Sequence, residues 1–193
     1  DGKNDYYDYF IGFTNFSTDG ETAMRDNSEK DSYRSDNLTM NYGYNFNNNL
    51  RLENYLYYND SLLEYDSVSK SQNDIEATDD QQAIYTARLI NTIGNLKNTI
   101  SYNNTYVLRN TTGNSKKNYY GYRDAINFVS QYNFDLDNRI IFGLDNEFDK
   151  AELYNYYTGS AYLESDESVF SQYFDVQLRP KEKIYTTFGL RRV

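Results

Sequence analysis

The chain carries many carboxylates but lacks the residues that most often turn carboxylates into catalysts. It has 29 Asp and Glu against 19 Lys and Arg, no His and no Cys in 193 residues. His is the commonest side chain for proton transfer and for binding transition metals. Without Cys there is neither thiol chemistry nor a disulfide framework. Because no distinctive nucleophile setting accompanies the acids, the sequence predicts that the protein is not an enzyme.

Three further kinds of chemistry find little support. The sequence DLDNR at 135–139 begins like a calcium-binding loop, but Ile140 stands where the sharp turn of such a loop needs Gly. We interpret this segment as a hairpin turn. A net charge of −10 argues against a nucleic-acid partner, because the phosphate backbone would be repelled. The Asn-x-Ser/Thr sequons are interpreted as incidental in an Asn-rich chain; they begin at Asn15, Asn37, Asn59 and Asn110.

The elements that must position these residues are strands, because apolar and polar residues alternate along most of the chain. In the stretch 37–58, every second residue from Leu38 to Phe46 is apolar, and the alternation resumes at Leu50 after three asparagines. This pattern indicates two amphipathic strands joined by a tight turn. The same pattern recurs and predicts about nine strands. They cover residues 6–17, 36–46, 50–61, 82–93, 97–109, 118–133, 138–150, 167–178 and 183–193.

Short and long connections take turns between these strands. The short ones are Asn47-Asn48-Asn49, Gly94-Asn95, Asp135-Leu136-Asp137 and Pro180-Lys181-Glu182. The long ones, which are polar and often acidic, cover 18–35, 62–81, 110–117 and 151–166. A meander with short turns at one end and long loops at the other is the layout of an outer-membrane β-barrel.

Composition and strand length favour the same fold. Only 38% of the residues are hydrophobic, and they include 23 Tyr and 11 Phe, whereas soluble domains carry about 45–50% apolar residues. Strands of about 9–11 tilted residues cross a bilayer, and lipid against the apolar face would replace a protein core. We therefore predict an all-β fold, an antiparallel up-and-down meander of about nine long strands that is part of a transmembrane β-barrel. The alternative is a soluble antiparallel sandwich.

The alternation also predicts which residues share a face of the sheet. One face should carry Leu38, Met40, Leu52, Leu56, Phe128, Phe142, Phe174 and Phe188. The other should carry Asn41, Glu53, Asn127, Asp145, Asp175 and Arg191. The first and last strands, near 6–17 and 183–193, should be open edges, because an odd number of antiparallel strands does not close into a barrel.

The stretch 8–68 carries Gly-Phe at 12–13, EKDSYR at 29–34, Gly-Tyr at 43–44 and D-x-x-x-E-Y-D at 60–66. With these motifs it resembles the early barrel strands of TonB-dependent outer-membrane receptors, most of all the vitamin B12 (cobalamin) receptor branch. The sequence NRIIFGLDNEFDKAE, from 138, is similar to a strand of the family that precedes a long loop. The sequence YFDVQLRPKEKIYTTFGLRRV, from 173, is similar to the hairpin that follows that strand.

The resemblance implies a barrel of about 22 strands, closed by an N-terminal plug domain. Such a receptor lies in the bacterial outer membrane, contacts its lipid, and imports a scarce small-molecule chelate with energy passed on by TonB through the plug. Residues 1–193 would then be part of the barrel, with the plug domain and the remaining strands absent. The chain ends at Val193 without the terminal aromatic residue of complete barrels, so both ends are expected to be cut.

The resemblance also implies a calcium site in the loops. In the cobalamin branch, aspartates of two neighbouring extracellular loops bind calcium and order those loops for substrate. Glu29 and Asp31 match one pair of that pattern, Asp66 matches another member, and Glu21 aligns loosely with the remaining one. Oxygen ligands of this kind suit Ca²⁺, although Glu replaces Asp at two of the four positions. The alternative is a solvated acidic surface.

Two other functions stay open at this point. The first is a structural or adhesive outer-membrane barrel with no role in import. The second is a soluble β-sheet binding module. A plug domain with a TonB box would distinguish import from the first, and partitioning of the protein into detergent would exclude the second.

Overall fold

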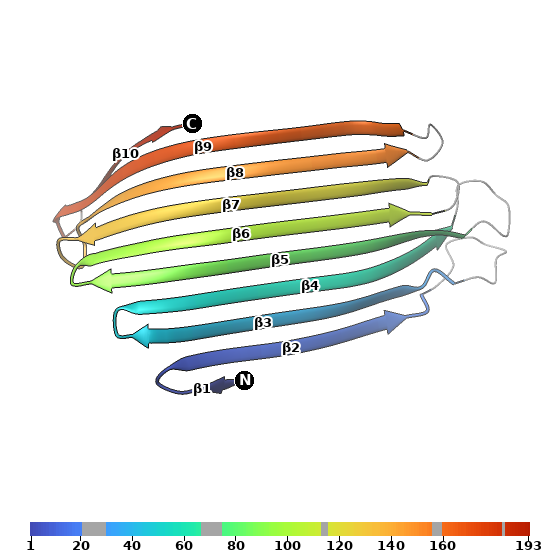
Figure 1. The fold of residues 1–193 in the computed structure, drawn as a ribbon, viewed down its shortest axis with the longest axis horizontal. Helices are drawn as coiled ribbons and strands as arrows, with labels where there is room; N and C mark the ends of the chain where they lie inside the picture. Colours follow the sequence, from blue (N-terminus) through green and yellow to red (C-terminus); the bar gives the residue numbers. More distant parts are fainter. Residues whose placement is uncertain (21–29, 67–74, 113–115, 156–159, 183) are drawn as a thin grey trace.

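The computed structural model describes residues 1–20, 30–66, 75–112, 116–155, 160–182 and 184–193 as a single sheet of ten strands in sequence order. Each strand pairs antiparallel with its neighbours in sequence (Figure 1). No helix of the described residues is long and apolar enough to cross a membrane. The strands are β1 (Gly2–Lys3), β2 (Tyr7–Thr18), β3 (Tyr33–Asn47), β4 (Leu50–Asp66), β5 (Ile75–Ile93), β6 (Leu96–Thr111), β7 (Lys117–Asn133), β8 (Arg139–Asn155), β9 (Ser160–Lys181) and β10 (Ile184–Arg192).

The predicted fold class is confirmed: the sheet is an antiparallel up-and-down meander of long strands. The strand count differs from the prediction by one, because Gly2 and Lys3 fold back onto Tyr9 and Asp8. The side chain of Asn4 stabilises the turn between β1 and β2, because its Oδ1 accepts hydrogen bonds from the backbone N–H groups of Tyr6 and Tyr7, both at 2.8 Å. With ten strands described, the argument from an odd strand number no longer applies.

The predicted division into two faces is also confirmed. Cross-strand partners lie on the same face, and the registers pair Met40 with Leu56 and Phe142 with Phe174. On the opposite face, the registers pair Asn127 with Asp145. Following the partners from strand to strand places all eight predicted apolar residues on one face, here called the apolar face. All six predicted polar residues lie on the other, the polar face.

The strands are longer than predicted at the end opposite the short turns. β5 begins at Ile75 rather than at residue 82, and β9 begins at Ser160 rather than at 167. The polar residues of these segments pair across the sheet although they lack apolar alternation. At the other end, Pro180 and Lys181 belong to β9 rather than to the turn. Pro180 lies beside a register irregularity between β9 and β10, a place where the missing N–H of Pro is tolerated.

The described residues form one layer with almost no apolar core. Ala125 is the one hydrophobic residue among them that is buried. Large apolar side chains such as Phe13, Phe174 and Leu190 remain exposed, and they gather on the apolar face. Nothing in the described part of the chain covers that face.

The short turns lie together at one end of the sheet (Figure 1). Gly94 has φ +57 in the β5–β6 turn, a backbone conformation that favours glycine. Arg179 links two neighbouring turns: its Nη1 lies 3.0 Å from Asp137 Oδ2, and its Nη2 donates to the carbonyl oxygen of Glu182 at 2.7 Å. The β7–β8 and β9–β10 turns are thus held to each other.

Asp135 should give the β7–β8 turn a pH-dependent stability. The Asn138 side chain, followed by backbone N–H groups of Asp137 and Asn138, holds the pKa of Asp135 below its ordinary value. A lowered folded-state pKa means that this stabilisation is present above the unfolded pKa of about 3.9 and is lost as pH falls through the folded value. The protection factors of the Asp137 and Asn138 amides, which are corrected for the pH dependence of intrinsic exchange, should fall below that pH, and Asp135→Asn should remove the transition. Protection factors that do not change with pH in the unsubstituted protein would contradict this.

Both edges of the described sheet have unpaired backbone groups. β1 covers only Asp8 and Tyr9 of β2, so β2 from Phe10 onward has no strand on its outer side among the described residues. β10 likewise pairs with β9 alone in that part of the chain. The sheet is not closed.

Candidate functional site

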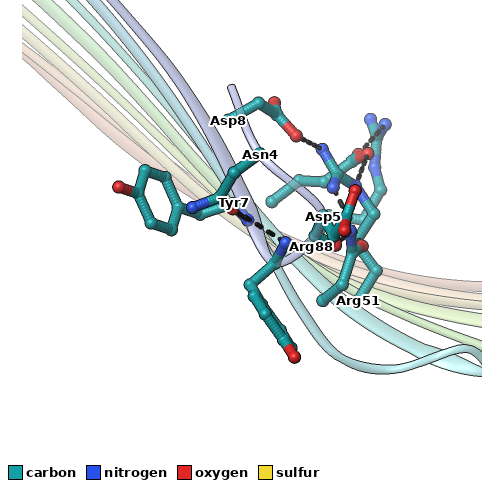
Figure 2. Close-up of polar contacts among 9 residues, drawn as sticks. Asn4, Asp5, Tyr7, Asp8, Arg51 and Arg88 are labelled. Atoms are coloured by element: carbon teal, nitrogen blue, oxygen red, sulfur yellow. Dashed lines mark hydrogen bonds and ion pairs between the residues drawn. The ribbon is translucent and has the colours of Figure 1, made fainter. Parts of the chain in front are cut away.

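The polar face carries an arginine cluster near the short turns, made of Asp8, Asn45, Arg51, Glu53 and Arg88 (Figure 2). The Arg51 guanidinium donates to Asp8 Oδ1 at 2.8 Å, Glu53 Oε1 at 2.9 Å and Asn45 Oδ1 at 3.0 Å. Arg88 Nη1 lies 3.5 Å from the second oxygen of Glu53. The cluster connects β2, β3, β4 and β5, and its two arginines face two carboxylates.

Gly43 makes room for this cluster. On β3, Gly43 is the cross-strand partner of Asp8 on β2 and of Glu53 on β4. A Cβ at position 43 would collide with the Arg51 guanidinium and approach Asp8 Oδ2, so the arginine crosses β3 because this residue has no side chain. A shallow pocket of ≈ 280 Å³ lies beside the cluster, and Tyr55 and Thr86 help to line it.

A second group, here called the polar belt, crosses the sheet from β5 to β10. Asn103 Nδ2 donates to Asn127 Oδ1 at 2.8 Å, and Asn127 Nδ2 donates to Asp145 Oδ1 at 3.0 Å. Ser171, which is fully buried, and Arg191 complete this hydrogen-bonded series. The polar belt consists of Thr86, Asn103, Asn127, Asp145, Ser171 and Arg191, one residue from each strand from β5 to β10.

Farther from the short turns, two arginines of the polar face are held by bidentate pairs. Arg109 contacts both oxygens of Asp80, at 2.6 and 3.0 Å, and Arg123 contacts both oxygens of Asp149, at 2.5 and 2.7 Å. Such forked pairs fix the guanidinium plane. The polar face is therefore densely hydrogen-bonded, with Arg51, Arg109 and Arg123 each held by an acid, and it presents a polar surface that water can wet.

The predicted calcium ligands fall at the other end of the sheet. Glu21 and Glu29 lie outside the described residues. Asp31 precedes β3 and Asp66 ends β4, and the Ser32 carbonyl oxygen accepts a hydrogen bond from the Glu64 N–H at 2.9 Å. The backbone near Asp31 thus runs beside the end of β4. Within the described ranges, no group of three or more acidic side chains is arranged to hold a metal ion.

Asp145 is expected to be the residue on which the polar belt depends most. It accepts from Asn127 and Ser171, and Arg191 lies 3.6 Å from its Oδ2. Asp145→Ala would remove the acceptor of Asn127 and of the buried Ser171, whereas Arg191 would keep its hydrogen bond to Ser171. A buried group left unpaired costs about 1–3 kcal/mol. The unfolding free energy should therefore fall by about that amount, measured by denaturant titration in detergent micelles.

Asp175→Ala is the matched control for that substitution, because Asp175 lies on the same face over Gly189 and outside the polar belt. We expect a change of at most about 0.5 kcal/mol there. Equal losses of unfolding free energy in the two variants would show that the polar belt contributes no more to stability than other residues of the polar face.

Sequence reasoning placed Asn127, Asp145 and Arg191 on the polar face but missed their connection. The signal for this connection is that Asn, Asp and Ser occur at directly paired or diagonal positions of consecutive strands. These positions are known only once the register is known. No protein-family model and no curated protein sequence matches the chain. The functional argument therefore depends on the geometry of the sheet.

Proposed function

We propose that this sheet is part of the wall of a bacterial outer-membrane β-barrel. One observation supports this most: long strands carry an apolar face that nothing in the described chain covers, and the opposite face is polar. The wall of a membrane barrel has this arrangement, with lipid on one side and a wet interior on the other. The short turns, gathered at one end, would face the periplasm.

The exposed apolar area is too costly for a sheet in water. Phe13, Leu190 and Phe188 are 69%, 63% and 58% exposed, and many other apolar side chains of the face are similarly uncovered. Burying one Leu or Phe side chain is worth roughly 1.5–3 kcal/mol. Lipid contact would gain this free energy for a whole face at once, whereas a soluble sheet would expose the face.

We propose further that the barrel is a TonB-dependent receptor that imports cobalamin or a similar scarce chelate. The resemblance of the segments 8–68 and 138–152 to that family supports this. The polar face, with its paired arginines, suits a barrel interior that holds water, polar protein segments or a polar solute.

Uptake by whole cells tests the transport proposal. Cells producing the full-length protein as their one cobalamin receptor should accumulate labelled cobalamin, and accumulation should stop when TonB is deleted. Partitioning of the protein into the detergent phase is measured in parallel. Detergent partitioning without TonB-dependent uptake would favour a structural or adhesive barrel. Recovery in the buffer phase would favour a soluble β-sheet binding module.

Calcium binding at Glu21, Glu29, Asp31 and Asp66 stays a prediction of the family resemblance. If these acids hold one ion, millimolar Ca²⁺ should protect the segments 18–35 and 62–81 of the full-length receptor from protease. Asp31→Asn together with Asp66→Asn should abolish that protection, with Mg²⁺ as the ion control, because Mg²⁺ demands a smaller and more regular ligand shell. Unchanged cleavage in Ca²⁺ would favour the solvated acidic surface.

A further inference from the structure

We propose that the shallow pocket at the arginine cluster, here called the Gly43 pocket, binds one neutral sugar ring. The inference goes beyond the proposed import of a chelate. It also does not depend on what covers the apolar face, because the neighbouring strands β2–β5 form the pocket on the polar face. The polar side chains that carry the argument are Asp8, Asn41, Arg51, Glu53, Tyr55 and Arg88, all of which line it.

The base of the pocket is fixed by the missing side chain of Gly43. The Arg51 guanidinium lies over this residue, in the space that a Cβ would occupy. Asp8 and Glu53 hold the guanidinium there with hydrogen bonds of 2.8 and 2.9 Å, the first of which Figure 2 shows. The volume of ≈ 280 Å³ is close to the lower end of small-molecule sites, which is about 300 Å³. A single ring fits such a space better than a long chain.

Several hydrogen-bond donors around the pocket are unused. Arg88 is 48% exposed, and its one contact is the 3.5 Å approach of Nη1 to Glu53 Oε2, although a guanidinium carries five N–H donors. Asn41 and Tyr55 are cross-strand partners, and neither makes a hydrogen bond or ion pair with another described residue. Donors from three neighbouring strands therefore meet at a space where the described chain offers them no acceptor.

Acceptors and a balanced charge accompany these donors. The hydrogen bonds to Arg51 use one oxygen of Asp8 and one of Glu53, so the second oxygen of each carboxylate is left for a ligand. The two arginines and the two carboxylates cancel in charge. An anionic ligand would meet the acids and a cationic ligand the arginines. Because a hydroxyl group both donates and accepts, an uncharged ligand with several hydroxyls can use all of these groups.

Tyr55 favours a sugar over other uncharged polar ligands. It is half-buried and lies between Asn41 and Thr86 in the register, so its neighbours restrict the ring. A pyranose carries C–H groups on its faces and hydroxyls around its edge. An aromatic ring with a phenol hydroxyl offers an apolar surface and a polar group side by side, which matches both parts of the sugar.

Saturation-transfer NMR on the full-length protein tests the proposal. The protein is purified in lauryldimethylamine oxide, a detergent without a sugar headgroup. The probes are the methyl glycosides of glucose, galactose and mannose, and at least one should bind with a dissociation constant of about 1–10 mM, the range of a small ligand in a shallow site. The uronate and the amino sugar with the same ring should bind about fivefold more weakly, because each carries a charge toward a like charge of the pocket.

Two substitutions remove separate groups of the pocket. Tyr55→Phe keeps the aromatic ring and removes the hydroxyl, and Arg88→Gln removes the unused guanidinium donors. Each should weaken binding of the neutral glycoside about fivefold, the effect of one lost hydrogen bond. Tyr57→Phe is the matched control: Tyr57 is the next polar-face residue of β4, its hydroxyl donates to Asn37, and it does not line the pocket. Its substitution should leave the dissociation constant unchanged.

A neutral glycoside that binds to the unsubstituted protein and to Tyr57→Phe, but more weakly to Tyr55→Phe and Arg88→Gln, supports the Gly43 pocket. Three results would overturn it: no saturation transfer to any of the three glycosides, tighter binding of the charged sugars, or equal weakening by Tyr55→Phe and Tyr57→Phe. Detergent partitioning and TonB-dependent uptake are separate measurements. The sugar site can therefore fail while the barrel and the import proposal hold, and the reverse is equally possible.

Discussion

An arginine in place of Ile100 is expected to destabilise the protein in a bilayer by about 2–4 kcal/mol, the cost measured for Arg at the midplane of barrel proteins. Ile100 is 51% exposed and points from the apolar face of β6. Its cross-strand partners on either side are Leu89 and Phe128. The guanidinium would therefore enter hydrocarbon with no acid beside it. The measurement is denaturant unfolding of the full-length protein in lipid vesicles.

Thr99→Arg is the matched control for Ile100→Arg. The two positions are adjacent on β6, so strand propensity and the distance from the turn are nearly the same, but Thr99 lies on the polar face. We expect a change within about 0.5 kcal/mol there, because the guanidinium would reach water. Equal destabilisation at both positions would contradict the assignment of the faces, and a larger loss at Thr99 would reverse it.

The 193-residue chain without lipid or detergent is expected to aggregate rather than remain monomeric. Two features act together: the uncovered apolar face, and the open edges of β2 and β10. Unpaired strand edges pair with other chains in water, and in hydrocarbon each unpaired backbone group costs several kcal/mol. Sedimentation in buffer and in detergent micelles measures this, with large particles expected in the first and small ones in the second.

Planar-bilayer recording of the same chain provides a second measurement. Because the described sheet is not closed, the 193 residues alone should give no discrete, stable conductance. Stable channels of one size would mean that the edges join each other or those of other copies. In the sedimentation experiment described above, a monodisperse monomer in buffer would contradict the proposal that lipid covers the apolar face and would favour the soluble β-sheet binding module.

Much of this fold could be predicted because a strand exposes its side chains with period two. Residues such as Leu38 and Phe174 share a face by parity alone once both are assigned to strands. The short turns at Asn47–Asn49 and Gly94-Asn95 were predictable because they interrupt the alternation with turn-forming residues. These features depend only on residues that are close together along the chain, so a single sequence is enough to predict them.

The strand ends away from the short turns could not be predicted in the same way. The sequences of segments 75–81 and 160–166 are mainly polar and show no sustained apolar–polar alternation, and backbone pairing with neighbours extends them into strands. The pairing of Gly2 and Lys3 with β2 was missed for a related reason, since two residues give no period. In both cases hydrogen bonds from neighbouring strands decide the structure.

The candidate site was only partly predictable. Parity placed Asp145 and Arg191 on the polar face, but the polar belt needs the register of every hairpin. The arginine cluster depends on Gly43, whose missing side chain matters because Arg51 crosses it. The candidate calcium ligands came from resemblance alone, and Glu21 and Glu29 lie outside the described residues.

The nearest-neighbour pairing of the strands has a consequence for assembly. In the described sheet every strand pairs only with the strands before and after it in sequence. The formation of each strand pair therefore does not require a distant part of the chain. Closing a turn as short as Gly94-Asn95 costs little chain entropy, because this cost rises with the logarithm of loop length. Folding can therefore proceed as a zipper, with each completed hairpin serving as the template for the next. An additional hairpin would lengthen the zipper and widen the sheet while leaving every existing pair unchanged.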